Sequence, residues 1–463
     1  MKNLWILTEE RPKKQSLEVI LDYFAKVQSI AYKGGDLWIC PLLNKDKCFD
    51  FTYEVKGFNS SKVDHVYIKT VSGSSSFVDY LLYYQEETPT SQDSPLLAIE
   101  ETKTDDGESR NTGVYQRATK FVLLKFFYPQ IKCAMFYSLH VEQKKKPTDT
   151  YIFGTRMLKT IGIDILGKVL EAELYEPFST IEELVAFKQS MNAPRSSKNV
   201  SIQITQCKDD IFISGRLYKD GGIGHDPNIG SLSLICATLR KLGWTGNITI
   251  TKHGLLQNHV KGNNKFLQVV NKLNILLDDI VVPTCELSET YWHYETKGEK
   301  LGTIFIHTIV ENLTNGFSVF DNHAGCEKSY FSTVDGRYIP LMKYEDRDLY
   351  KAGDKSKRLS IPDLVLIDIE TKESITIEGK TFANRYKGIE ELKLYDSFEN
   401  IYLCEYYPEF NHIRTVVLYG GNKEEIVEVE IGFLLNKKGR MVLGMRAPQL
   451  FVKAVRNLIS YWS

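Results

Sequence analysis

The chain has 463 residues, with 58 basic and 59 acidic side chains and a formal net charge of −1. This length predicts two or three domains, and 43% hydrophobic residues are enough to fill several cores. The balanced charge argues against a protein that coats DNA without sequence preference, because such binding depends on excess Lys and Arg. A sequence-specific DNA enzyme stays open, because its basic residues can line a cleft while its acidic residues lie elsewhere.

Cysteine usage and hydropathy predict the cellular context. Eight Cys residues are scattered without a close pair, which favours reduced core thiols over a zinc ribbon or a disulfide framework. No apolar stretch approaches the ~20 residues of a membrane span, and the N-terminal apolar run is too short for a signal peptide. We therefore expect a cytoplasmic protein with no membrane association.

Strand and helix patterns alternate along residues 1–165, the first expected domain of a mixed α/β (α+β) fold. An apolar LWIL segment opens this domain, and an amphipathic helix over 16–28 follows. Two apolar strands over 77–84 and 96–103 enclose a polar turn, which predicts an antiparallel hairpin. A polar loop and a helix then occupy 104–129.

Residues 166–290 are expected to form a middle region that recognises DNA. A Gly-rich loop enters a helix within 219–244, but it has neither the Lys and hydroxyl of a P-loop nor the spacing of a dinucleotide-binding loop. The loop either contacts DNA through His225, Asp226 and Asn228 or is a simple connection. Residues 251–274 are rich in Lys, His, Asn and Gln, side chains that can read base edges in the major groove.

Residues 291–463 repeat the element order of the first domain and are expected to form the third. The predicted elements are a helix over 303–317, a hairpin over 361–380, a helix within 381–398, a strand over 413–421 and a closing helix over 452–462.

One arrangement occurs in both outer domains: an Asp on an apolar strand, a polar turn, and a second apolar strand that ends in Glu-x-Lys. The residues are Asp79, Glu101 and Lys103 in the first copy, and Asp363, Glu378 and Lys380 in the second. The alternation of a strand places the Glu and the Lys on one face. Two carboxylates can hold Mg²⁺, and a Lys can orient the attacking water and stabilise charge on a phosphate.

This pattern resembles the PD-(D/E)XK nuclease superfamily, which includes many type II restriction endonucleases. The likeness covers about 77–128 and 361–420 in detail. The second copy matches better, because Pro362 and Asp363 give the literal PD and the hairpin is tight. Val78 replaces the Pro in the first copy, and its turn is longer. For each copy the alternative is a surface hairpin with a solvated Glu and Lys.

The resemblance implies two catalytic centres, in which Asp79, Glu101, Asp363 and Glu378 hold Mg²⁺. In this superfamily the opening helix often carries an acid near the site, here Glu18 or Glu311, although a plain core helix is the alternative for Glu18. The helix after the catalytic strand borders the DNA backbone, or else has only a basic solvent face. The expected DNA contacts are Arg110, Gln116, Arg117, Lys120, His225, Asn228, Lys252, Asn258, Lys261, Asn263, Asn264, Lys265, Arg385 and Lys387.

The implied function is that of a type II restriction endonuclease, with Mg²⁺-dependent, sequence-specific hydrolysis of double-stranded DNA. A homodimer suits a palindromic site, whereas one chain with two different domains suits an asymmetric one, each centre cutting one strand. Such an enzyme would be a monomer or weak dimer, with a cognate DNA methyltransferase as companion. Two alternatives stay open: a one-site nuclease acting as a dimer, and a non-catalytic DNA-binding subunit that has kept the fold.

Overall fold

The chain forms two compact units, each a mixed α/β assembly. The computed structural model describes residues 2–43, 49–73, 77–102, 113–138, 147–167, 172–191, 202–219, 222–223, 226–260, 264–294, 299–323, 330–342, 358–420, 433–435, 441–443 and 447–462. Unit 1 comprises Met1–Lys14, Ile30–Val71 and Tyr294–Ser463, and unit 2 comprises Gln15–Ser29 and Ser72–His293. The mixed α/β class is therefore confirmed.

These units do not follow the three consecutive segments expected from the sequence. Residues 1–165 contribute to both units, and 166–290 share unit 2 with much of that segment. Local composition predicts boundaries where the chain is polar, but a compact unit is defined by contacts between residues far apart in sequence.

The N-terminal part of unit 1 contains four strands in the order β2-β3-β4-β1. Their bounds are β1 (Lys2–Thr8), β2 (Tyr32–Leu43), β3 (Phe49–Ser60) and β4 (Val63–Gly73). Strand β1 runs parallel to β4 and places Ile6 opposite Ile68, whereas β3 is antiparallel to both of its neighbours. The apolar residues of β1 predicted from LWIL are buried.

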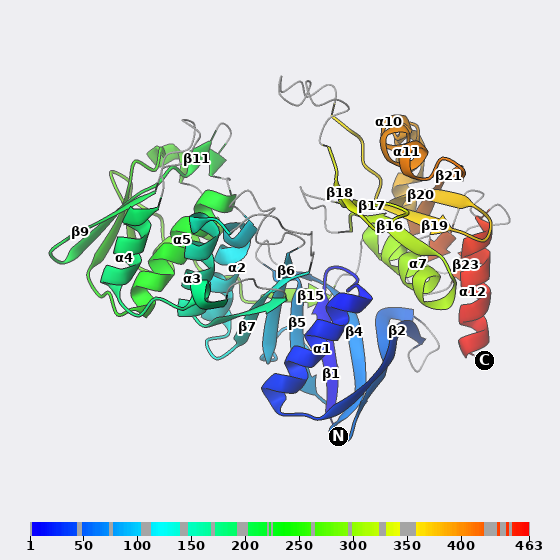
Figure 1. The fold of residues 1–463 in the computed structure, drawn as a ribbon, viewed down its shortest axis with the longest axis horizontal. Helices are drawn as coiled ribbons and strands as arrows, with labels where there is room; N and C mark the ends of the chain where they lie inside the picture. Colours follow the sequence, from blue (N-terminus) through cyan, green and yellow to red (C-terminus); the bar gives the residue numbers. More distant parts are fainter. Residues whose placement is uncertain are drawn as a thin grey trace. The chain divides into compact units, whose positions relative to one another are not determined.

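The C-terminal part of unit 1 is a six-stranded sheet in the order β16-β19-β20-β21-β22-β23 (Figure 1). The strands are β16 (Phe317–Asp321), β19 (Leu364–Asp368), β20 (Glu373–Thr381), β21 (Asn411–Tyr419), β22 (Phe433–Leu435) and β23 (Met441–Leu443), and a separate hairpin joins β17 (Tyr330–Ser332) to β18 (Tyr338–Pro340). Strand β20 is antiparallel to β19 and parallel to β21, so the hairpin expected over 361–380 is formed.

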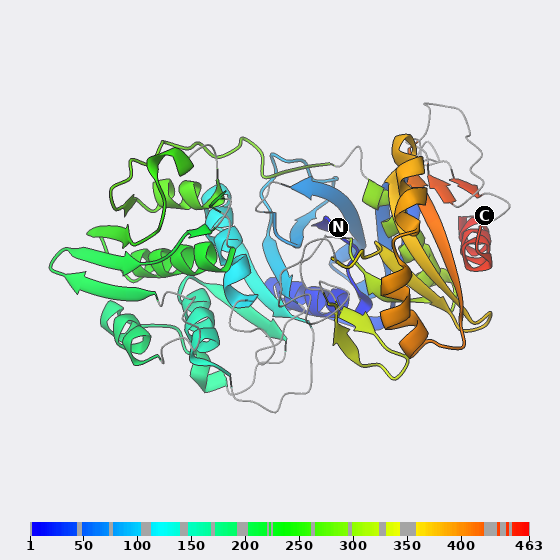
Figure 2. The same cartoon turned by 90° about the horizontal axis from the view of Figure 1, so that it is seen from above.

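Helices cover both faces of this sheet. They are α7 (Glu299–Leu313), the 3₁₀ turn η4 (Phe382–Asn384), α9 (Arg385–Leu392), α10 (Asp396–Phe398), the π-helical turn η5 (Glu399–Leu403), α11 (Cys404–Tyr406) and α12 (Gln449–Trp462). Gly302 of α7 lies against Val417, and Gly388 of α9 lies against Val416, so these helices meet successive residues of β21 on opposite faces. Helix α12 (red in Figures 1 and 2) packs beside α7.

Unit 2 contains a sheet in which β5, β6, β7 and β8 are successive neighbours. The strands are β5 (Tyr80–Gln85), β6 (Leu97–Thr102), β7 (Lys132–Tyr137) and β8 (Ile163–Gly167). Strands β5 and β6 form the expected antiparallel hairpin, and β6, β7 and β8 run parallel. The helices are α1 (Lys14–Gln28), α2 (Gly113–Phe127) and α3 (Asp149–Thr160). Leu17, Ile20, Leu21 and Phe24 of α1 are buried at helical spacing, as predicted.

The rest of unit 2 surrounds a four-stranded sheet in the order β14-β13-β10-β9 (Figure 2). Its elements are η1 (Ala172–Tyr175), α4 (Ile181–Ser190), β9 (Gln203–Cys207), β10 (Asp210–Ser214), β11 (Tyr218–Lys219), β12 (Gly222–Ile223), α5 (Asp226–Lys241), β13 (Asn247–Thr251), η2 (Gln257–His259), α6 (Lys265–Lys272) and β14 (Ile275–Leu277). A further short strand, β15 (Trp292–Tyr294), is not part of this sheet. In the described part of the chain, no helix is long and apolar enough to cross a membrane.

Candidate active site

The hairpin of β19 and β20 brings Asp363, Glu378 and Lys380 together in unit 1. Asp363 lies just before β19, and its N–H donates to the carbonyl of Ile377 at 3.1 Å. Its Oδ2 accepts from the N–H of Gly379 at 2.8 Å. Two backbone contacts therefore fix the carboxylate of Asp363 beside the strand that carries the other two residues.

Glu378 is almost fully buried, with 5% of its surface exposed. It accepts hydrogen bonds from the Lys380 ammonium and from the hydroxyl of Tyr395. Burial, followed by the negative charge of Asp363, raises the pKa of Glu378 to about 7, although Lys380 and Tyr395 act in the opposite direction. The carboxylate pair therefore favours a bound proton or another cation.

Lys380 is held by carboxylates from two elements. It is 6% exposed, and its Nζ lies 2.7 Å from Oε2 of Glu391 on α9, in addition to its contact with Glu378. Burial raises the pKa of Glu391, but hydrogen bonds involving Lys380 and Glu378 bring it below its ordinary value. Gly388 leaves room for the Lys380 stem, because a Cβ at Gly388 would lie 2.9 Å from Lys380 Cγ.

The hairpin of β5 and β6 in unit 2 builds a similar pair from Asp79 and Glu100. Asp79 Oδ2 accepts from the N–H of Glu101 at 2.7 Å, and the N–H of Asp79 donates to Glu100 Oε2 at 3.1 Å. In both hairpins, the Asp accepts from the residue that follows the buried Glu. The two sites share this backbone arrangement despite their different turn lengths.

Glu100 receives its positive partners from helix α2. It is 1% exposed, with Lys120 Nζ at 2.7 Å and Arg117 Nε at 3.2 Å from Oε1. Burial, followed by the charge of Asp79, raises the pKa of Glu100 to about 7. Lys120 also lies 4.0 Å from Asp79 Oδ1, and although burial lowers its pKa, Glu100 and Asp79 raise it overall.

This arrangement differs from the expected grouping of Asp79, Glu101 and Lys103. Glu101 accepts from the hydroxyls of Ser16 at 2.8 Å and Tyr80 at 2.6 Å, so its carboxylate faces α1. Glu100 faces α2 because successive side chains of a strand point in opposite directions. The register of the hairpin therefore pairs Asp79 with the preceding acid, and Lys103 lies outside the described residues.

Several residues expected to contact DNA have partners within the protein. Arg117 and Lys120 bind Glu100, and Asn228 Nδ2 donates to the Arg216 carbonyl at 2.8 Å. Asn264 caps α6 by accepting from Phe266 N–H at 2.9 Å. These four side chains therefore already stabilise the fold.

The remaining expected contacts vary in exposure. Lys252 and Asn258 are exposed, and Lys265 is half-buried at the start of α6. Arg385 stacks 4.5 Å from the Phe382 ring, and Lys387 is exposed with Glu391 at 3.5 Å. Four others, Arg110, His225, Lys261 and Asn263, lie outside the described residues, as does the side chain of Gln116.

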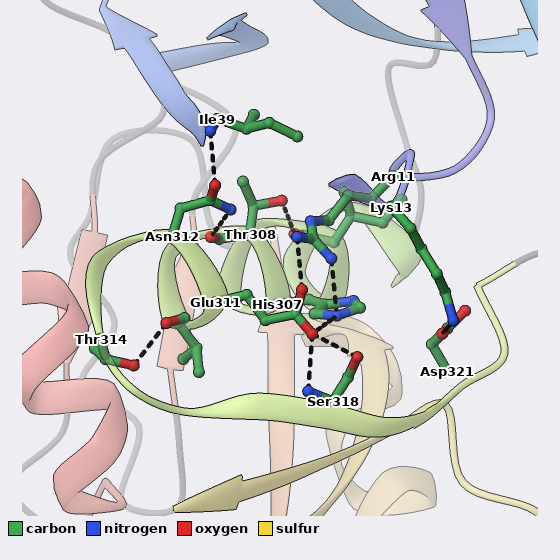
Figure 3. Close-up of polar contacts among 12 residues, drawn as sticks. Arg11, Lys13, Ile39, His307, Thr308, Glu311, Asn312, Thr314, Ser318 and Asp321 are labelled. Carbon is green, nitrogen blue, oxygen red and sulfur yellow. Dashed lines mark hydrogen bonds and ion pairs between the residues drawn. The ribbon is translucent and has the colours of Figure 1, made fainter. Parts of the chain in front are cut away.

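The two acids expected on opening helices differ in environment. Glu18 is exposed on α1. Glu311 on α7 instead binds Arg11 Nη2 at 2.7 Å and accepts from the N–H of Ser318 at 2.8 Å (Figure 3). Burial raises the pKa of Glu311, but Arg11 and the adjacent His307 hold it well below its usual value. Lys13, two residues beyond Arg11, lies 3.2 Å from Asp321.

Glu311 therefore anchors the segment that follows β1 to helix α7. His307 extends this network, with Nε2 at 3.0 Å from Arg11 Nη1 and Nδ1 at 2.9 Å from His323. Sequence reasoning missed this network and Glu391, because their partners lie on elements distant in the chain. The neighbouring Glu and Lys residues of 9–14 resemble an ordinary solvated turn.

Among the described residues, no group of three or more His, Cys, Asp and Glu side chains has the geometry of a metal site. Each hairpin instead offers a pair of carboxylates, Asp363 with Glu378 and Asp79 with Glu100. Carboxylate oxygens are ligands that Mg²⁺ prefers, and Mg²⁺ commonly takes only one or two from the protein.

Known proteins provide no close match to this chain. No protein-family profile matches it, and no curated protein matches it. A solved structure of a purple acid phosphatase from yellow lupin (Lupinus luteus) seeds aligns with 48% of this chain at 12% identity and a TM-score of 0.14. The alignment spans 42% of that protein's own length. A similarity this weak carries no argument about fold or function.

Proposed function

We propose that this protein is a Mg²⁺-dependent, site-specific endonuclease that cuts double-stranded DNA by the chemistry of the PD-(D/E)XK nucleases. The observation that carries the proposal is the cluster of Asp363, Glu378 and Lys380 on one hairpin. Hydrolysis of a phosphodiester needs acidic oxygens for a divalent cation and a positive group for the phosphate, and this cluster supplies both.

The pair of Asp363 and Glu378 fits Mg²⁺ by its oxygen donors and by its charge. Asp363 contributes to the raised pKa of Glu378, so the pair carries negative charge that the nearby Lys380 does not fully offset. Mg²⁺ fills its other positions with water and phosphate oxygens, so two carboxylates are sufficient. When bound, the ion would lower the pKa of a water molecule and neutralise charge on the phosphate.

The protein groups have separable roles in this mechanism. Asp363, held by Gly379 N–H, and Glu378, held by Tyr395, are the two carboxylates that would hold the cation. The Lys380 ammonium would orient the attacking water and stabilise the pentacovalent phosphate, or, as the neutral amine, Lys380 would take the proton of that water; Glu391 positions the side chain. In-line attack then leaves a 5′-phosphate and a 3′-hydroxyl.

We extend the proposal to the other hairpin, the first centre along the chain, built from Asp79 and Glu100 with Lys120 as its ammonium. The matching backbone contacts of the two Asp residues and the matching pKa shifts of the two buried Glu residues support it. Because Lys120 comes from a helix, the first centre would not need a Lys on its own strand. Lys103, outside the described residues, is the alternative donor.

Supercoiled plasmid separates one centre from two. If each centre cuts one strand, Lys380→Ala and Lys120→Ala should each convert plasmid to the open circle, and the double variant should bind DNA without cutting. Lys393→Ala is the matched control, because Lys393 forms an exposed ion pair with Glu390 at 2.8 Å. Lys103→Ala tests the alternative donor in the first centre.

Each outcome has a definite meaning. If the Lys120 and Lys103 variants both still linearise plasmid fully, the Asp79 centre is not catalytic. The protein is then a one-site nuclease that uses the Asp363 centre and cuts both strands as a dimer. Undiminished cleavage by Lys380→Ala would contradict the mechanism. A purified chain that binds DNA but cuts no sequence with Mg²⁺ would support the non-catalytic subunit instead.

We further propose that unit 2 reads the target through 251–265, where Lys252 and Asn258 are exposed. Side chains of these types can pair with guanine and adenine edges. With two unlike centres in one chain, the enzyme would act as a monomer or weak dimer on an asymmetric sequence. A companion DNA methyltransferase would protect the host copy of that sequence.

A further inference from the structure

A second chemically organised cluster lies on unit 1 and involves Cys404, His412 and Ser374. Cys404 is exposed at the start of α11, and its Sγ lies 3.7 Å from Nε2 of His412. The other ring nitrogen of His412, Nδ1, lies 2.5 Å from the hydroxyl oxygen of Ser374. A nucleophile, a base and a residue that orients the base are therefore in contact with one another in that order.

The sheet fixes the base and its orienting group. Ser374 on β20 and His412 on β21 are register partners in a parallel strand pair, and Ser374 is fully buried. When Ser374 accepts from Nδ1–H, Nε2 carries the free lone pair and points at the exposed thiol. The thiol of Cys404 also donates to Asn400 Oδ1 at 3.7 Å, one helical turn earlier, so its proton has a second acceptor besides His412.

This environment contrasts with that of the other thiols. Burial raises the pKa of Cys133 and Cys236 to about 12, which suppresses the nucleophilic thiolate. Cys207 is exposed on β9. Of the described Cys residues, only Cys404 has both solvent access and an imidazole within reach of its sulfur.

We propose that Cys404 is a reactive thiol, activated by His412, that is modified by soft electrophiles. The sulfur forms a bond to the electrophilic atom, the leaving group departs with its electron pair, and His412 Nε2 takes the thiol proton. Ser374 positions the imidazole for this step. Glu378 lies four residues beyond Ser374 on the same strand, about 13 Å away at ~3.3 Å per residue, so the thiol site is distinct from the proposed nuclease centre.

Alkylation of the intact chain with iodoacetamide at pH 7 tests this assignment. Mass spectrometry of the separate cysteine peptides should give a rate for Cys404 about tenfold above that for Cys207. His412→Gln should lower the Cys404 rate to that of Cys207, and Ser374→Ala should lower it partway. The Cys207 rate should not change in either variant.

Controls separate reactivity from unfolding and from exposure alone. Cys40, a buried thiol of unit 1, should stay unmodified in every variant, because its exposure would report loss of the fold of that unit. Equal rates for Cys404 and Cys207 in the unaltered protein would overturn the proposal, even without any variant. A Cys404 rate that His412→Gln leaves unchanged would also overturn it, because accessibility alone would then explain the result.

Discussion

Replacing Asp363 with Asn should stabilise the C-terminal sheet of unit 1 at alkaline pH when no divalent cation is present. An Asn keeps an oxygen that can accept from Gly379 N–H, but it removes the negative charge beside Glu378. The pKa of Glu378 is raised from 4.5 to about 7 in the folded protein. The folded state therefore binds a proton more tightly than the unfolded state within this window.

The sign and size of the effect follow from this shift. As pH rises from about 4.5 to about 7, the unfolded chain has lost the proton that Glu378 retains, so stability falls and stays low above pH 7. Each pKa unit corresponds to about 1.4 kcal/mol, so the whole penalty is at most about 3 to 4 kcal/mol. Burial is the largest cause and remains after the substitution, so Asp363→Asn should recover about 1 kcal/mol.

Hydrogen exchange of the β20 amides in EDTA measures this change locally. At pH 8, exchange limited by opening should be about fivefold slower in Asp363→Asn than in the unaltered protein, and at pH 5.5 the two should agree. Asp79→Asn is the matched control, because it should slow β6 and leave β20 unchanged. Mg²⁺ at pH 8 should protect β20 in the unaltered protein only. Faster exchange of β20 in Asp363→Asn at pH 8 would show that the charge of Asp363 does not destabilise the folded sheet.

Three further outcomes test the site and its surroundings. Gly388→Ala should reduce cleavage at least tenfold and cost about 1 kcal/mol of stability, because the new Cβ would lie 2.9 Å from Lys380 Cγ and 3.1 Å from Val416 Cγ1. Plasmid cleavage measures the first effect and thermal melting the second. Activity equal to that of the unaltered protein would show that cleavage does not depend on a fixed position of Lys380. Mg²⁺ or Mn²⁺ should support cleavage and Ca²⁺ only binding, as gel shift and end mapping would report; equal cutting in EDTA would remove the metal mechanism. Asn264→Ala should cost about 1 kcal/mol of unfolding free energy through the lost cap of α6 and weaken binding to all DNA sequences alike; a loss confined to one sequence would return Asn264 to base recognition.

The sequence predicted the two hairpins because the signals for a hairpin are local. Apolar alternation and a polar turn lie within twenty or so residues, and both hairpins form where they were expected. The choice between Glu100 and Glu101 could not be made in the same way. Either acid satisfies the alternation of a strand, and the choice depends on the register with the strand that follows Asp79.

The ion-pair partners that helices supply were harder to predict than the hairpin residues themselves. Lys120 reaches Glu100 from a helix, and Glu391 reaches Lys380 from another. Nothing in the spacing of either strand specifies these contacts, since they depend on how each helix packs across its sheet. The same limit applies to Ser374 and Cys404, which lie on separate elements and meet through His412.

The division of the chain between the two units determines when each unit can fold during synthesis. Unit 1 uses Met1–Lys14 and Ile30–Val71 at one end of the chain and Tyr294–Ser463 at the other. At a translation rate of about 5–20 residues per second, the early strands wait roughly 20–80 s for their C-terminal partners. Unit 2 lacks this delay, because every residue it needs is synthesised before Tyr294. The nascent chain therefore carries β1 to β4 without the C-terminal part of unit 1 for most of its synthesis, and until α7 is made the surface of β2 that it contacts stays uncovered, which favours aggregation and chaperone binding.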